Sequence, residues 1–132
     1  MKTLSVLFVE DDIDTVCGTI AGLIRLGHKV DVSNDITDAT KKLKNNNYDF
    51  VIVDINLKEH NDSELDTSGL DLINEIEGGR FDERNSETVY ALYTNQRRSL
   101  NSKNVKQSDR YFGVYSKNSY VKFLLNFRKR FG

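Results

Sequence analysis

The sequence predicts an α/β fold in which a parallel β-sheet is covered by helices on both faces. Two observations lead to this prediction. Short apolar runs, typical of strands buried on both faces, alternate along the chain with segments whose apolar residues recur at helical spacing. The chain also has 132 residues, a length that one hydrophobic core can stabilise, so residues 1–132 are expected to form a single domain.

The charge balance and the cysteine content limit the classes of protein to which the chain could belong. The 19 basic and 20 acidic side chains nearly cancel, so no overall field draws the chain to nucleic acid or to a membrane surface. The lone Cys17 cannot form an internal disulfide, and it is expected to be a small core residue of a helix. No apolar stretch has the length of a membrane span or the pattern of a signal peptide, so a reduced, cytoplasmic protein is expected.

The first predicted strand is the apolar run LSVLFV at residues 4–9, which ends at the acidic triplet Glu10, Asp11 and Asp12. A helix is expected next, with Asp12 as its amino-terminal cap and Gly27 as its carboxyl-terminal cap. Its predicted buried face carries apolar residues at helical spacing: Ile13, Val16, Cys17, Ile20 and Ile24.

A second strand, KVDVS at residues 29–33, precedes a helix that Asp35 can cap and that the asparagines at 45–47 end. Three apolar residues of this helix are expected to point inward: Ile36, Ala39 and Leu43. The third strand, FVIVD at 50–54, is apolar up to its last residue, Asp54. An isolated carboxylate is costly to remove from water, so Asp54 is expected to have a compensating partner.

The second half of the chain continues the alternation after a polar, acidic insert at 58–68, which is predicted to be a loop. The next helix is indicated by Leu70, Ile73 and Ile76 and stops at Gly78 and Gly79. Two further strands are expected at residues 88–94 and 111–116, joined by a segment with few apolar anchors that predicts at most a short helix. The final helix places five apolar residues at helical spacing: Tyr120, Phe123, Leu124, Phe127 and Phe131.

Residues with reactive or charged side chains follow the ends of these strands. In an open parallel sheet the carboxyl ends of the strands meet at one edge, where ligands bind. Glu10, Asp11, Asp54, Thr94 and Lys117 are therefore expected to converge. Clustered carboxylates suit a divalent cation, typically magnesium, and with that charge neutralised Asp54 can act as a nucleophile on a phosphoryl group. The hydroxyl of Thr94 and the ammonium of Lys117 would hold the phosphoryl oxygens.

Each of these residues also has a structural interpretation when considered alone. A strand-end aspartate is often a turn or capping residue, Glu10 and Asp11 could cap the first helix, and an isolated lysine is usually a solvated surface residue. The presence of all five residues at the ends of predicted strands favours a functional role over these structural roles. His28 and His60 lack neighbouring ligands in the sequence, so neither receives a metal or catalytic role, and the basic RKR near the carboxyl end is attributed to solubility and the helix dipole.

Four motifs in order resemble the receiver domain of two-component response regulators: VLFVEDD, YDFVIVDINL, ALYTN and GVYSK. The resemblance covers essentially the whole chain and implies a flavodoxin-like (βα)5 three-layer sandwich with a five-stranded parallel sheet. It implies that Asp54 receives a phosphoryl group from a histidine kinase or phosphotransfer protein, and that Thr94 and Lys117 bind that group. It assigns magnesium to four residues: Glu10, Asp11, Asp54 and, through its backbone carbonyl, Asn56.

The same resemblance implies a stand-alone receiver that signals to a protein partner, without direct contact to nucleic acid or a membrane. The expected activity is self-catalysed phosphotransfer and autodephosphorylation at most, so the chain is not expected to be an enzyme in the usual sense. Some members of the family pair through the last helix and its neighbours, so a homodimer is compatible with the resemblance.

Three departures from the family pattern support an alternative function. Asn118 stands where a proline usually follows the lysine, Asn95 replaces a small residue after Thr94, and Val114 occupies a position that is often aromatic. Tyr115 should point to the opposite face of its strand. The alternative is a pseudo-receiver, a protein-binding module that signals without phosphorylation. A magnesium-dependent phosphohydrolase is a third class, opposed by Asn56, which stands where such an enzyme needs an acid-base aspartate.

Overall fold

The computed structural model describes residues 3–54, 68–94, 109–116 and 120–131, excluding the side chains at 68, 70 and 94. The five strands form one parallel sheet, as predicted, and their order in it is β2-β1-β3-β4-β5. Their bounds are β1 Ser5–Val9, β2 Lys29–Ser33, β3 Phe50–Asp54, β4 Val89–Thr94 and β5 Tyr111–Ser116. The predicted insert loop at 58–68 lies outside the described residues except for Ser68, and so does the predicted short helix between β4 and β5.

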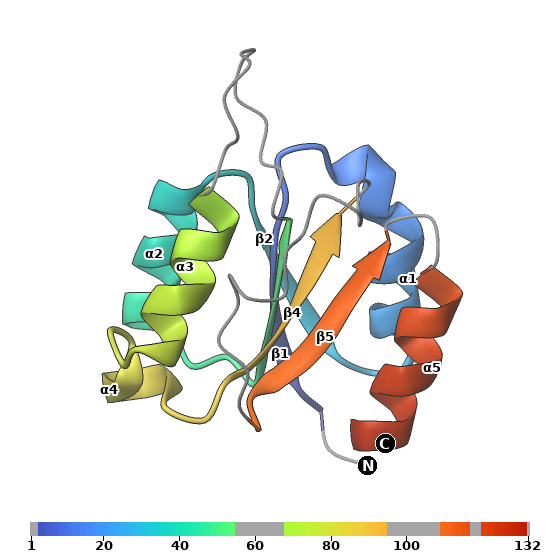
Figure 1. The fold of residues 1–132 in the computed structure, drawn as a ribbon. Helices are drawn as coiled ribbons and strands as arrows, with labels where there is room; N and C mark the ends of the chain where they lie inside the picture. The colour runs from blue at the N-terminus through green and yellow to red at the C-terminus, as the bar shows by residue number, and fades with distance from the viewer. Residues whose placement is uncertain (1–2, 55–67, 95–108, 117–119, 132) are drawn as a thin grey trace.

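Helices cover both faces of the sheet, which gives the three layers expected from the sequence (Figure 1). The helix α1 (Cys17–Arg25), entered through the 3-10 turn η1 (Ile13–Val16), packs beside α5 (Tyr120–Phe131) on one face. The other face carries α2 (Ile36–Asn45), α3 (Ser68–Glu77) and the short α4 (Asp82–Asn85). The helix α4 was not predicted because a single turn is too short to show helical periodicity. Within the described residues, no helix has the length and apolar composition of a membrane span.

Two hydrophobic cores lie on opposite faces of the sheet because successive strand side chains point in opposite directions. In β3, Val51 and Val53 face the α2/α3 layer, whereas Phe50 and Ile52 face the α1/α5 layer. The α1/α5 core is rich in aromatic rings, and Phe50 makes edge-on contact with four of them. Burial on both faces explains why the third strand reads as an unbroken apolar run.

The buried face of the first helical segment agrees with the prediction only in part: Val16 is buried and Ile20 packs against the α1/α5 core. Cys17, expected in the core, is exposed, and Ile24 is 56% exposed. The segment starts with a 3-10 turn, which has 3.0 residues per turn rather than 3.6, so the α-helix begins in a different rotational phase. The side chains that α1 buries are consequently Thr19 and Leu23. Gly27 ends the helix with a φ of 97°, as a carboxyl-terminal glycine should.

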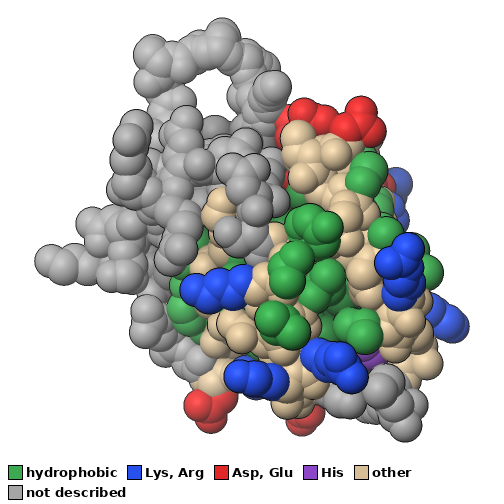
Figure 2. Space-filling view, turned by 90° about the vertical axis from the view of Figure 1, so that its right-hand side faces the viewer, with side chains coloured by type: hydrophobic (Ala, Val, Ile, Leu, Met, Phe, Trp, Pro, Cys, Tyr) green, Lys and Arg blue, Asp and Glu red, His purple; other side chains and the backbone are tan. Residues whose placement is uncertain are grey.

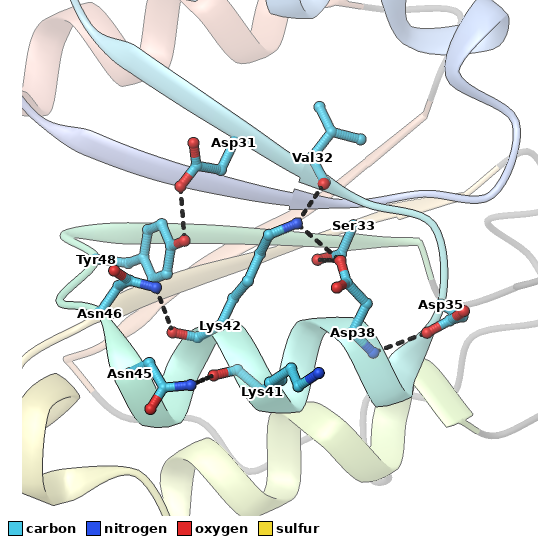
Figure 3. Close-up of polar contacts among 10 residues, drawn as sticks. All are labelled: Asp31, Val32, Ser33, Asp35, Asp38, Lys41, Lys42, Asn45, Asn46 and Tyr48. Carbon is cyan, nitrogen blue, oxygen red and sulfur yellow. Dashed lines mark hydrogen bonds and ion pairs between the residues drawn. The ribbon is translucent and has the colours of Figure 1, made fainter.

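The helix α2 is fastened to the edge strand β2 by a polar network (Figure 3). The Asp35 carboxylate caps the helix by accepting from the Asp38 backbone N–H at 2.8 Å, which confirms the predicted cap. Lys42 Nζ donates to the Val32 carbonyl at 2.9 Å and to Asp38 at 2.7 Å, and the Ser33 hydroxyl donates to Asp38 at 2.7 Å. These donors lower the pKa of Asp38. Lys42 also covers a main-chain acceptor on the edge of the sheet, where another strand could otherwise pair.

Candidate metal centre

Three acidic side chains meet at the carboxyl edge of the sheet, as the sequence predicts. Strands β1 and β3 are neighbours, and Val9 pairs with Val53 in register. The next residues along the two strands, Glu10 and Asp54, therefore stand beside each other, and Asp11 follows Glu10. Each of the three carboxylates offers an oxygen, and these oxygens lie within 4.8 Å of one another.

The order of the strands explains why the acidic residues meet at this position. From β1 the chain passes to β2 on one side, and it then returns to β3 on the other side of β1. The connections that leave β1 and β3 therefore diverge, and the carboxyl ends of two such strands are the position where open α/β sheets bind ligands. Glu10 directly follows β1 and Asp54 is the last residue of β3, so both lie at this position.

Burial distinguishes the three carboxylates. The side chains of Glu10 and Asp54 are 0% and 1% exposed, whereas Asp11 is exposed. One oxygen of Glu10 accepts a hydrogen bond from the Asp12 backbone N–H at 3.1 Å, which holds the side chain against the start of η1. Because like charges repel strongly where little water separates them, two buried carboxylates beside a third suit a bound cation.

The donor set fits a divalent cation with a preference for oxygen. Magnesium is usually bound by one or two carboxylates and keeps several waters, which leaves positions for a substrate oxygen. The cluster offers two buried carboxylates and one exposed carboxylate. Because Asp11 is exposed, a cation bound beside it could keep water ligands on that side. The residues that the sequence assigns to metal binding, and that the structure describes, are therefore suited to it.

Other predicted site residues are described only in part. Thr94 is the last residue of β4 and pairs with Ser116, the last residue of β5, so its backbone reaches the same edge of the sheet. The side chain of Thr94 lies outside the described part of the chain, as do Asn56 and Lys117. The roles assigned to these three residues stay predictions.

Asp12 caps the first helical turn differently from the prediction. It occupies the amino-terminal cap position of η1, but its carboxylate makes no capping hydrogen bond. Its backbone carbonyl instead accepts from the backbone N–H of Thr15 at 3.0 Å and from the Thr15 hydroxyl at 2.8 Å.

Tyr93 links the edge of the sheet to α1, a connection that sequence reasoning missed. It precedes Thr94 and pairs with Asp54 in register. Its hydroxyl lies 2.9 Å from the Thr19 hydroxyl in the α1/α5 core, and its burial raises its pKa. No local pattern indicates this contact, because Thr19 and Tyr93 are 74 residues apart in the sequence.

The last strand confirms one further prediction about side-chain direction. Val114 packs with the α2/α3 core, whereas Tyr115 lies in the α1/α5 core on the opposite face. The Tyr115 hydroxyl accepts a hydrogen bond from the Asn126 side-chain amide at 3.0 Å, which connects β5 to α5.

His28 makes structural contacts between the start of the chain and α5. Its Nδ1 accepts a hydrogen bond from the Leu4 backbone N–H at 3.1 Å, and its ring meets Phe127 edge-on. Burial lowers the pKa of His28, a shift that Asp49 opposes. The other histidine, His60, lies outside the described residues.

Comparison with solved structures gives consistent matches over the whole chain. A chemotaxis response regulator, CheY4 of Vibrio cholerae, matches with a TM-score of 0.70 and 19% sequence identity, covering 98% of each chain. The Thermotoga maritima response regulator TrrA, solved with magnesium and beryllofluoride, matches with a TM-score of 0.69 and 23% identity, covering 97% of this chain and 98% of the other. A CheY-like receiver domain protein from Methanospirillum hungatei matches with a TM-score of 0.68 and 13% identity, covering 98% and 94%.

These proteins are similar to this chain in structure rather than in sequence. The sequence matches no protein-family model and no curated protein. The fold is nevertheless that of CheY-like response regulator receiver domains, a five-stranded flavodoxin-like sandwich, as predicted. Its acidic residues occupy the edge of the sheet where such open α/β folds bind their ligands.

Proposed function

We propose that this chain is a response regulator receiver that accepts a phosphoryl group on Asp54 in a magnesium-dependent step and then signals to a protein partner. The observation that carries the proposal is the cluster of Glu10, Asp11 and Asp54 at the carboxyl ends of the neighbouring strands β1 and β3. The donor would be the phosphohistidine of a histidine kinase or of a phosphotransfer protein. Such a role fits a protein of the cytoplasm.

In the proposed reaction, an oxygen of Asp54 attacks the phosphorus of the donor. The new O–P bond forms as the P–N bond to the donor histidine breaks, and the departing imidazole takes up a proton. Glu10, Asp11 and Asp54 would hold magnesium, which when bound would neutralise charge at the phosphoryl oxygens. Asn56 would supply a further ligand through its carbonyl.

The remaining predicted residues have supporting roles in this proposal. Thr94 and Lys117 would bind the phosphoryl oxygens after transfer, because a phosphoryl group adds roughly two negative charges. A shift at the end of β4 would also move Tyr93, whose hydroxyl contacts Thr19 of α1. Turnover would be limited to phosphotransfer and self-catalysed hydrolysis of the acyl phosphate, so the chain would act as a switch rather than as an enzyme.

Intact-protein mass spectrometry after incubation with acetyl phosphate and magnesium tests the proposal. The expected result is a gain of one phosphoryl group that maps to Asp54 and requires magnesium. Asp54→Ala should abolish the adduct, whereas Asp12→Ala, a neighbouring exposed carboxylate, should retain it. Persistence of the adduct in Asp54→Ala would refute the assignment.

A second phosphodonor separates the proposal from the phosphorylation-independent alternative. A phosphorylated phosphotransfer protein presents its phosphohistidine through a docked surface, so it should modify Asp54 even where a small donor is slow. Failure of both donors would favour the pseudo-receiver, which binds partners without phosphorylation.

A further inference from the structure

The helix α5 carries two apolar stripes, although packing on the sheet requires only one. The first stripe contains Phe123 and Phe127, which are fully buried in the α1/α5 core. The second contains Val121 and Leu125 on another side of the helix, and Leu124, partly buried against the α1/α5 core, lies next to them. Val121 and Leu125 are 58% and 56% exposed. A surface helix of a globular domain normally has a single apolar face, so the second stripe is unexplained by the fold.

The second stripe belongs to a larger apolar surface shared with α1. In the described part of the chain, all exposed large hydrophobic residues lie on these two helices: Ile24, Tyr120, Val121 and Leu125. Between the helices runs a groove of about 250 Å³, with Gly22 and Leu124 among its lining residues. Gly22 lets the helices approach closely, because an added Cβ would lie 2.4 Å from a Leu124 methyl carbon. Figure 2 shows this face, with hydrophobic side chains at its centre.

The rim of the groove is positively charged. Arg25 and Arg128 line it from opposite helices, and within the described residues neither makes a salt bridge. The helices α1 and α5 contain five basic and no acidic residues, although the whole chain has a net charge of -1. Figure 2 accordingly shows Lys and Arg side chains around the apolar centre. Because the rim carries only positive charge, it favours a partner with negative charge over one with positive charge.

A second copy of the chain fits the groove poorly. In a symmetric dimer the same surface meets itself, so Arg25 and Arg128 of one protomer would face those of the other with no carboxylate on either helix to pair them. Like charges brought together at an interface oppose association. A partner with carboxylates beside an apolar strip complements the groove in both shape and charge.

We propose that the α1/α5 groove docks an acidic amphipathic helix of a partner protein. Apolar residues of that helix, spaced at i, i+3 or i+4, and i+7, would contact Val121, Leu124 and Leu125, and flanking Glu or Asp residues would pair with Arg25 and Arg128. The groove is small, so the complex is expected to be transient, with a dissociation constant on the order of micromolar.

This inference does not depend on phosphorylation of Asp54. The nine residues of α1 span about 13 Å along the helix, and Arg25 is at the end remote from Asp11. A phosphodonor approaching the acidic cluster and a helix in the groove would therefore contact different parts of the surface. Binding to the groove can be measured with the unphosphorylated protein.

Fluorescence anisotropy with stapled helical peptides tests the proposal. The probes are three-turn peptides that carry leucines at i, i+4 and i+7, or at i, i+3 and i+7, flanked by Glu, with matched Gln and Lys versions. The Glu peptides should bind about tenfold more tightly than the Gln peptides, and added salt should weaken them. Asp54→Ala should bind within about twofold of wild type, which separates this inference from the proposed function.

Surface variants locate the binding. Leu125→Ser and the double variant R25E/R128E should each weaken the Glu peptides about tenfold, and R25E/R128E should prefer the Lys peptides. The matched control K41E/K44E makes the same change in net charge at exposed positions of α2 and should leave binding within about twofold. All of these side chains are exposed, so the variants should fold, and circular dichroism would verify this.

Several results would overturn the inference. These are the absence of binding by every Glu peptide, equal binding by the Glu and Lys peptides, and binding that is unaffected by R25E/R128E. Sedimentation showing a dimer that Leu125→Ser dissociates would assign the groove to a second copy. Co-sedimentation with phosphatidylserine vesicles that Leu125→Ser abolishes would assign it to a membrane surface.

Discussion

Replacing Asp54 by asparagine should make the protein more stable when magnesium is absent. The substitution removes one negative charge from a cluster whose oxygens lie within 4.8 Å of one another, and it nearly preserves the shape of the side chain. Asp54 and Glu10 are 1% and 0% exposed, so water screens their mutual repulsion weakly. A residue arranged for function commonly lowers stability in this way.

The magnitude follows from the separation of the charges. Two unit charges 4.8 Å apart repel by about 3.5 kcal/mol at an effective dielectric constant of 20. Neighbouring groups and solvent reduce this value, so Asp54→Asn should raise the free energy of unfolding by about 1 to 3 kcal/mol. For a domain of this size, that corresponds to an increase in Tm of roughly 3 to 12 °C.

Thermal melts of wild type and Asp54→Asn, each with chelator and with millimolar magnesium, provide the test. Wild type should gain more from magnesium, because a ligand that binds only the folded state stabilises it and the variant has lost a metal ligand. Asp12→Asn is the matched control, since Asp12 is exposed and its carboxylate makes no capping hydrogen bond. A lower Tm for Asp54→Asn than for wild type in chelator would refute the repulsion argument.

Two further predictions concern buried polar residues away from the cluster. His28 must be neutral to accept a hydrogen bond from the Leu4 backbone N–H, and its pKa in the folded protein is lowered from 6.5. As the pH falls, His28 therefore binds a proton in the unfolded chain before it does so in the folded protein. The free energy of unfolding should consequently decrease as the pH drops below 6.5. Urea melts between about pH 7 and about pH 5 should show this slope, and His28→Asn should flatten it; an equal slope in both proteins would contradict the assignment. Asn85 bonds to three backbone groups, so Asn85→Ala should cost about 2 to 4 kcal/mol, whereas the exposed Asn74→Ala should cost less than about 0.5 kcal/mol in the same melts. Equal losses at the two asparagines would show that the bonds of Asn85 contribute little.

Local patterns in the sequence were sufficient to predict the strands. The second, third and fifth strands occur at the predicted residues, and the first and fourth agree to within one residue. A strand buried on both faces must be apolar throughout, so its run of residues is visible without knowledge of its neighbours. The cap at Asp35 and the glycine at Gly27 were predictable for the same reason, because each acts on its own helix.

The rotational phase of α1 could not be predicted from apolar spacing. The pattern placed Cys17 and Ile24 in the core, and both are exposed. The 3-10 turn before the helix changes the angle between successive side chains, and the polar Thr19 is buried because Tyr93, distant in sequence, supplies its partner. A polar residue with a distant partner looks like a surface residue in any local pattern.

The acidic cluster and the α1/α5 groove show which features of a site local sequence patterns can predict and which they cannot. That Glu10 and Asp54 end their strands was visible in the sequence, but their separation follows from β1 and β3 being neighbours in register. The groove depends on tertiary structure still more strongly, because α1 and α5 lie at opposite ends of the chain and only their packing on one face brings Arg25 and Arg128 to a common rim. Propensity and hydrophobic periodicity act over a few residues, whereas sites formed between elements require the long-range contacts of the folded chain.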